Sequence, residues 1–177
     1  MSRIESALVN LQRWDERACA RLNRGLRYRL LRHVFRAVSR LGDGVFWYAL
    51  MLALLLRDAL EAALPVLHML VVGLVCTAVY KALKRGTFRP RPFQALAHID
   101  AGIAPLDRFS FPSGHTLHAV AFTLVAMIYY PGLAAVLVPF SVLVAASRVT
   151  LGLHYPSDVI AGAALGAAIA LASFTLT

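Results

Sequence analysis

Long apolar runs separated by short polar turns make up most of the chain after residue 40. Five runs contain no Asp, Glu, Lys or Arg: residues 45–56, 62–80, 116–130, 134–146 and 159–177. A helix needs about 20 apolar residues to cross a bilayer. The first run approaches that length if it extends back towards Val38 and Arg40 reaches the interface. The pattern predicts an all-α, polytopic transmembrane helix bundle with about five spans, possibly six.

The first forty residues have a different pattern, with ten Arg against three acidic residues. Apolar residues such as Ile4, Leu8 and Leu11 recur among them at helical spacing, which is typical of amphipathic helices. Such helices lie along a membrane surface or pack on the bundle with a polar face to the cytosol. We therefore divide the chain into basic amphipathic interfacial helices, residues 1–40, and a transmembrane domain, residues 41–177.

Composition supports this class of protein and excludes others. The chain is 59% hydrophobic, its mean hydropathy is +0.67, and 15% of its residues are charged, which is too apolar for an ordinary soluble domain. Its net charge is +9, but the basic residues are not interleaved with exposed aromatic residues, so no nucleic-acid partner is expected. Anionic membrane lipids or a phosphorylated substrate are the expected partners. Cys19 and Cys76 are too isolated in the sequence to indicate a disulfide framework or a metal site.

Five spans bring three separated polar segments to one side of the membrane. The loop after the second span and the loop after the fourth must lie on the same side, whereas the turns near Arg57 and Pro131 lie on the other. Residues 84–91, 113–115 and 148–158 can therefore converge on one site. Charged groups beside a bilayer are costly when unpaired, so this convergence indicates a functional site.

Residues 112–115, Pro-Ser-Gly-His, open the third span. Ser113 is suited to the N-cap position of a helix, and Gly114 leaves backbone amides open to a ligand. A helix N-terminus attracts anions such as phosphate, and His115 projects from its first turn. The alternative interpretation is a capped helix start without a ligand.

Residues 147–158 form the densest cluster of reactive side chains in the sequence. Pro156 is suited to the first turn of the fifth span, which places Asp158 in that turn and His154 just before it. The carboxylate can then orient the imidazole and leave Nε2 free as a nucleophile or base. The alternative is an Asp that complements the helix dipole beside an interfacial His.

Several cations accompany these segments. The guanidinium and ammonium groups of Lys84, Arg91 and Arg148 can bind the oxygens of a phosphoryl group. Four other cations are equally basic and can instead contact lipid phosphate or set the topology: Lys81, Arg85, Arg89 and Arg108. Composition does not separate the two sets.

Together the three segments resemble the type 2 phosphatidic acid phosphatase (PAP2) family of membrane lipid phosphate phosphatases. The family pattern is Lys, six residues, Arg-Pro; then Pro-Ser-Gly-His; then Ser-Arg, five residues, His, three residues, Asp. The chain matches it in order and spacing from Lys84 to Asp158. The resemblance implies that His154 attacks phosphorus, Asp158 orients His154, and His115 protonates the leaving oxygen. It also implies that the phosphate is bound by Lys84, Arg91, Ser113, Gly114 and Arg148. The resemblance implies that the reaction needs neither a metal nor another cofactor.

The resemblance implies hydrolysis of a lipid phosphate or diphosphate, such as undecaprenyl diphosphate or phosphatidylglycerophosphate. Two alternatives remain. One is a non-catalytic lipid-binding or transport protein. The other is an enzyme like the vanadium haloperoxidases, and the apolar spans argue against this second alternative. We expect an integral protein of the bacterial inner membrane. Of the 18 Lys and Arg, all but Arg57 fall on the side of the motifs, so the positive-inside rule favours a cytoplasmic active site. Many bacterial relatives are expected to work at the outer face instead.

Overall fold

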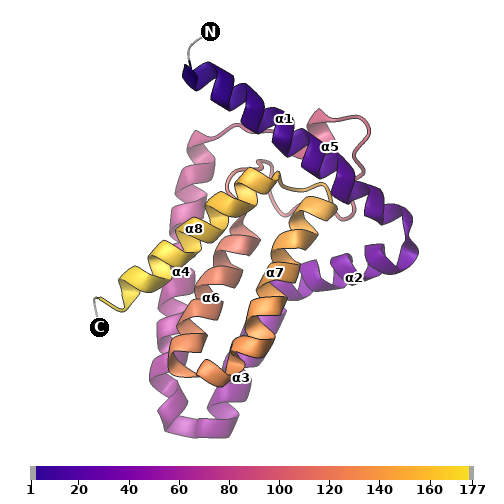
Figure 1. The fold of residues 1–177 in the computed structure, drawn as a ribbon. Coiled ribbons are helices and arrows are strands. Elements are labelled where there is room, and N and C mark those ends of the chain that lie inside the picture. Colours follow the sequence, from indigo (N-terminus) through magenta and orange to yellow (C-terminus); the bar gives the residue numbers. More distant parts are fainter. Residues whose placement is uncertain (1–2, 176–177) are drawn as a thin grey trace.

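The chain folds into a bundle of apolar helices with an amphipathic helix across one end (Figure 1). The computed structural model describes residues 3–175, which contain helices and no strands. The α-helices are α1 (Arg3–Asn23), α2 (Arg29–Arg40), α3 (Phe46–Asp58), α4 (Ala63–Gly86), α5 (Pro92–Ala95), α6 (Gly114–Tyr129), α7 (Ala134–Thr150) and α8 (Pro156–Ser173). The all-α prediction is confirmed.

The five predicted spans correspond to α3, α4, α6, α7 and α8. By length and composition, three continuous helical stretches can cross a membrane: Arg29–Gly86, which includes α3 and α4, Pro131–Thr150 and Pro156–Ser173. Helix α6 has 16 residues and is therefore about 24 Å long, shorter than the hydrocarbon core of about 30 Å. The last two residues of the predicted fifth span lie outside the described part of the chain.

Two helices are longer than predicted at the end that carries the motifs. Helix α4 continues to Gly86, although its apolar run ends at Tyr80, and α7 continues to Thr150 beyond Ala146. Lys84 and Arg148 therefore lie in the last turns of helices rather than in loops. Cations are favourable there because the C-terminal end of a helix carries partial negative charge.

The expected extension of the first span towards Val38 is wrong. A π-helical turn, Leu41–Val45, separates α2 from α3, and Gly44 within it has φ 131°, which is not helical. An L side chain adopts this backbone conformation only with strain, and glycine adopts it freely. As a result α2 lies at a steep angle to the bundle, beside α7, while α3 runs along the bundle (Figure 1).

Helix α6 is the centre of the bundle and contacts α4, α7 and α8. Its buried residues occur on all sides, as expected for a helix enclosed by others. Gly162 and Gly166 of α8 lie directly against its backbone; a Cβ atom at Gly162 would lie 2.5 Å from the carbonyl oxygen of Ser113. The Gly-x-x-x-Gly sequence of α8 thus serves close packing within the chain.

Helix α1 packs on the ends of α7 and α8. Its residues Asp15, Cys19 and Asn23 are buried, whereas Ile4 and Leu8 on the rest of its surface are exposed. The interpretation that the N-terminal helices pack on the bundle is therefore correct for α1. Contact of its exposed face with a membrane surface, and the division of the chain at residue 40, remain predictions.

Candidate active site

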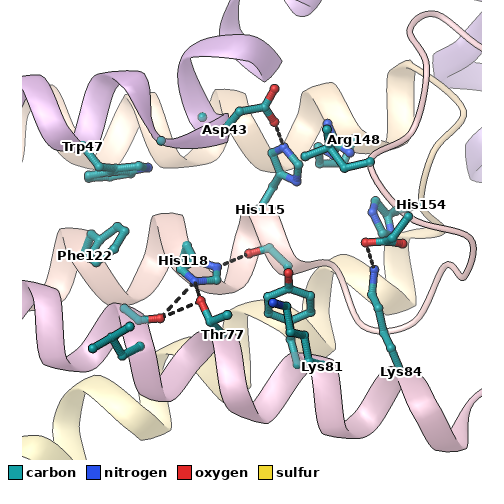
Figure 2. Close-up of a pocket in the computed structure, with 18 of the residues that line it drawn as sticks. Asp43, Trp47, Thr77, Lys81, Lys84, His115, His118, Phe122, Arg148 and His154 are labelled. Atoms are coloured by element: carbon teal, nitrogen blue, oxygen red, sulfur yellow. Dashed lines mark hydrogen bonds and ion pairs between the residues drawn. The ribbon is translucent and has the colours of Figure 1, made fainter.

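The three predicted segments meet at one end of the bundle. The C-terminal ends of α4 and α7 and the N-terminal ends of α6 and α8 lie together there (Figure 1). A cavity of about 880 Å³ opens at this end and is lined by α3, α4, α6 and the loop before α6. Its polar lining includes Lys84, Arg91, His115, Arg148 and His154, and its apolar lining includes Trp47, Met51, Leu70, Leu74 and Phe122. Figure 2 shows Trp47 and Phe122 at one end of the cavity and Lys84, Arg148 and His154 at the other.

Lys84 and Arg91 share one carboxylate at the polar end of the cavity. Lys84 Nζ lies 2.6 Å from one oxygen of Asp107, and Arg91 Nη2 lies 2.7 Å from the other. Burial acts to raise the pKa of Asp107, but the hydrogen bonds and charges of Lys84 and Arg91 outweigh it and hold that pKa below its ordinary value. Asp107 is partly exposed, so these two cations hold an anion at the cavity wall.

Arg148 is the third cation of the cavity. Its Nη1 donates a hydrogen bond to Ser39 Oγ of α2 at 2.5 Å. Its buried Nε has no hydrogen-bond acceptor within the described residues. A buried guanidinium donor without a partner is costly, and an anion in the cavity would remove that cost.

His154 is buried in the loop between α7 and α8 and lines the same cavity. Its Nε2 lies 3.3 Å from Arg91 Nη1. Burial lowers the pKa of His154 to about 3; Asp158 acts in the opposite direction, and Arg148 and Arg91 lower the pKa further. The imidazole is therefore neutral at neutral pH, so a ring nitrogen retains the lone pair that a nucleophile needs.

Asp158 lies beside His154, in the first turn of α8. Its Oδ2 is 3.8 Å from His154 Nδ1, which is near but longer than a hydrogen bond. The same oxygen accepts hydrogen bonds from the hydroxyl of Ser110 and from the backbone N–H of Tyr155, the latter at 2.8 Å. Its other oxygen accepts from Arg89 Nη1 at 2.6 Å. Three donors thus fix the Asp158 carboxylate beside the histidine.

The Pro-Ser-Gly-His segment contributes unequally to the cavity. Gly114 and His115 line it, and His115 Nε2 is paired with Asp43 Oδ1 of the turn between α2 and α3 (Figure 2). Ser113 is the residue before α6, as predicted, but its side chain is fully buried and contacts Thr116 Oγ1 at 3.0 Å. Ser113 therefore does not face the cavity in this structure.

His118 links two helices at the wall of the cavity. Its Nδ1 lies 2.8 Å from the carbonyl oxygen of Gly114, and its Nε2 lies 3.1 Å from Thr77 Oγ1 of α4 (Figure 2). These contacts give His118 a packing role between α6 and α4. His68 lies near the other end of α4, where its ring nitrogens form hydrogen bonds with Tyr129 Oη and Ser173 Oγ.

Five residues around the site were missed by the sequence analysis: Asp15, Asp43, Arg89, Asp107 and Ser110. Asp43 had a weak signal, because it is flanked by Gly42 and Gly44 in a chain with few acidic residues. In the sequence, Arg89 cannot be distinguished from cations that contact lipid or set the topology. It instead bridges Asp15 and Asp158.

Comparison with known proteins agrees with this geometry. The sequence pattern of the PAP2 superfamily matches residues 62–177, so the chain belongs to that superfamily. It is 36% identical over 89 residues to a lipid A 1-phosphatase of Rhizobium johnstonii, covering 48% of this chain and 36% of the relative. It is 33% identical over 105 residues to undecaprenyl-diphosphatase BcrC of Bacillus subtilis, covering 59% and 50%. The matches thus span a third to a half of these relatives.

Two solved structures resemble nearly the whole chain. A transmembrane PAP2-type phosphatidylglycerolphosphate phosphatase from Bacillus subtilis superposes with a TM-score of 0.73 at 26% identity, over 94% of this chain and 86% of that one. LpxE of Aquifex aeolicus superposes with a TM-score of 0.74 at 27% identity, over 88% and 92%. With its apolar helices, this likeness makes the chain an integral membrane protein.

Proposed function

We propose that this protein is a metal-independent lipid phosphate or diphosphate phosphatase that acts through a phosphohistidine. One observation carries the proposal: a buried, neutral His154 faces Lys84, Arg91 and Arg148 at the polar end of a cavity whose other end is apolar. A lipid phosphate has the same division into a charged head and an apolar tail.

The proposed reaction has two steps. In the first, the free nitrogen of His154 attacks phosphorus, the bond from phosphorus to the leaving oxygen breaks, and His115 gives its proton to that oxygen. In the second, water attacks phosphorus, the phosphorus–nitrogen bond breaks, and the water proton returns to His115. Inorganic phosphate and free His154 are the products, so the enzyme is regenerated.

The cations would stabilise the charge that spreads over the equatorial oxygens of phosphorus. Asp107 supports this assignment, because its carboxylate already engages Lys84 and Arg91 with hydrogen bonds of 2.6 and 2.7 Å. A phosphoryl group would take its place, and the unpaired Nε of Arg148 offers a further donor. We also propose that the amide of Gly114 and the Ser113 end of α6 contribute the positive end of the helix dipole.

We propose a polyprenyl diphosphate, such as undecaprenyl diphosphate, as the preferred substrate and phosphatidylglycerophosphate as the second candidate. Lys81 lines the cavity one turn before Lys84 on α4 (Figure 2), about 4.5 Å nearer the apolar end. It has no charged partner among the described residues. A second phosphate next to the reacting one would meet this ammonium group.

The first prediction tests this activity in detergent. Purified protein in EDTA should release phosphate from a lipid panel, with a higher kcat/KM for a polyprenyl diphosphate than for phosphatidic acid. Vanadate should inhibit it, because vanadate adopts the geometry of the phosphoryl transition state. Loss of activity in EDTA that returns only with a divalent metal would contradict the mechanism. Equal kcat/KM across the panel would contradict the substrate assignment alone.

We further propose that the active site lies on the cytoplasmic side of the bacterial inner membrane. The arginines of α1 and α2 lie on the same side of the membrane as the active site, and the positive-inside rule places them in the cytoplasm. Arg108, on the exposed loop at the cavity mouth, offers a test. In a variant without Cys19 and Cys76, Arg108→Cys should resist a membrane-impermeant maleimide in spheroplasts and react after permeabilisation. Reaction in intact spheroplasts would place the site at the outer face.

A further inference from the structure

Helix α1 presents a buried polar face to the active-site loop. Asp15, Cys19 and Asn23 are spaced four residues apart, so they lie on one side of the helix. Asn23 Nδ2 donates to the carbonyl of Thr150 at 3.0 Å, and Cys19 Sγ lies 3.6 Å from the carbonyl oxygen of His154. Helix α1 thus holds the backbone of the loop that carries His154.

Asp15 continues this contact to the start of α8. Its Oδ1 accepts the backbone N–H of Ser157 at 2.9 Å, and its Oδ2 accepts the hydroxyl of Ser157. Arg89 Nη2 donates to the same carboxylate at 2.7 Å. Asp15 has no exposed surface, so these three donors replace the water that a carboxylate otherwise requires.

Arg89 connects Asp15 to Asp158 through its two terminal nitrogens. Its Nη1 donates to Asp158 Oδ1 at 2.6 Å while Nη2 is held by Asp15. The guanidinium also lies over the ring of Tyr155, 4.0 Å from its centroid. Burial acts to lower the pKa of Arg89, but Asp158 and Asp15 outweigh it and raise that pKa above its ordinary value.

This geometry makes the orientation of Asp158 depend on α1. A guanidinium is a planar fork, so fixing one nitrogen on Asp15 fixes the direction of the other. That nitrogen holds Asp158 Oδ1, which leaves Oδ2 directed towards His154 Nδ1. Without Asp15, Arg89 can rotate towards Asp158 alone. Asp158 Oδ1 then shifts with it while Ser110 and the Tyr155 N–H still hold Oδ2, so the carboxylate tilts relative to the histidine.

We propose that Asp15 and Arg89 are positioning residues, through which the N-terminal helix sets the geometry of Asp158 and His154. The proposal rests on the proposed function, in which His154 is the nucleophile. It gives α1 a role in turnover, although α1 precedes the matched region of the superfamily, residues 62–177. Small displacements of reacting groups cost up to about 100-fold in rate.

The test is the single-turnover rate constant of phosphoenzyme formation for Asp15→Asn, with labelled lipid phosphate and an alkaline detergent quench, in which phosphohistidine is stable. The rate constant does not depend on how much protein is folded, whereas the amplitude does. We expect Asp15→Asn to lower the rate constant about 10- to 100-fold with KM unchanged. The matched control Glu16→Gln removes the same charge from the next residue of α1, whose side chain accepts a hydrogen bond from Gln12, and should leave the rate constant unchanged.

A second comparison keeps the test informative if Asp15→Asn does not fold. Arg89→Lys retains a cation but cannot bridge two carboxylates as a fork, so its rate constant should fall similarly. In the double variant Asp15→Asn/Arg89→Lys, the two losses in rate constant should not add, because both substitutions act through Asp158. Equal rate constants for Asp15→Asn and Glu16→Gln, with only the amplitude reduced, would overturn the positioning role. A wild-type protein that turns over without a phosphoenzyme would instead contradict the proposed function.

Discussion

Replacing His154 by alanine should abolish phosphate release, with a loss of at least about 10⁴-fold, the scale seen when a nucleophile is removed. The physical reason is that the phosphoenzyme cannot form without the ring nitrogen that faces Arg91. The measurement is phosphate release from a lipid phosphate, together with trapping of labelled phosphoenzyme. Wild-type protein should give an acid-labile, base-stable label, and His154→Ala should give none.

Two controls separate this loss from misfolding. His33→Ala removes an exposed histidine of α2 and should retain both activity and label. The thermal midpoint of His154→Ala in detergent should lie at or above that of the wild type at pH 5. The pKa of His154 is near 6.5 in the unfolded chain and about 3 in the folded protein, so below pH 6.5 the unfolded chain binds a proton that the folded protein does not. The stability that neutral His154 contributes above pH 6.5 is therefore lost as the pH falls towards about 3. Retained turnover in folded His154→Ala would remove His154 as the nucleophile.

Replacing His115 by alanine should have an effect that depends on the leaving group. For a lipid phosphate, whose alkoxide leaving group is poor, we expect a loss of about 10²- to 10⁴-fold in kcat, the usual contribution of a general acid. For an activated aryl phosphate, which needs no protonation to leave, the loss should be much smaller. Parallel assays with both substrates on the same preparation provide the measurement.

Asp43 supplies a graded comparison for His115, because its carboxylate is the partner of His115 Nε2. Asp43→Asn keeps the size of the side chain and should produce a smaller loss with the same dependence on the leaving group. His118→Ala removes the neighbouring histidine, which instead links α6 to Thr77 of α4, and its effect should be equal for both substrates. If His115→Ala lowers kcat equally for the lipid phosphate and for the aryl phosphate, His115 does not act as the general acid.

The local chemistry of the site was predictable from the sequence because it depends on short-range patterns. Apolar runs define helices when they are bounded by polar turns, and two loops lie on the same side of the membrane when an even number of spans separates them. Those rules brought residues 84–91, 113–115 and 148–158 to one end of the bundle, where the structure places them. Gly114 and His115 at the start of α6, and Asp158 in the first turn of α8, follow from the same local signals.

The partners of those residues were not predictable, because they come from segments distant in sequence. Asp107 pairs with Lys84 across 23 residues, and Asp15 reaches Ser157 across 142. Arg89 could not be distinguished from its basic neighbours until its position between two buried carboxylates was known. A basic residue looks the same in the sequence whether it binds a lipid, a substrate or an acidic side chain. Its neighbours in space determine which of these it binds.

The sequence by itself determined the class of fold, the end of the bundle where the three motifs meet and the candidate reactive side chains. The tertiary structure alone decided that Ser113 turns away from the cavity, that Asp43 pairs with His115, and that α1 lies against the loop of His154. The reason is physical: periodicity and capping act over a few residues of chain, whereas burial and hydrogen bonding act over a few ångströms of space.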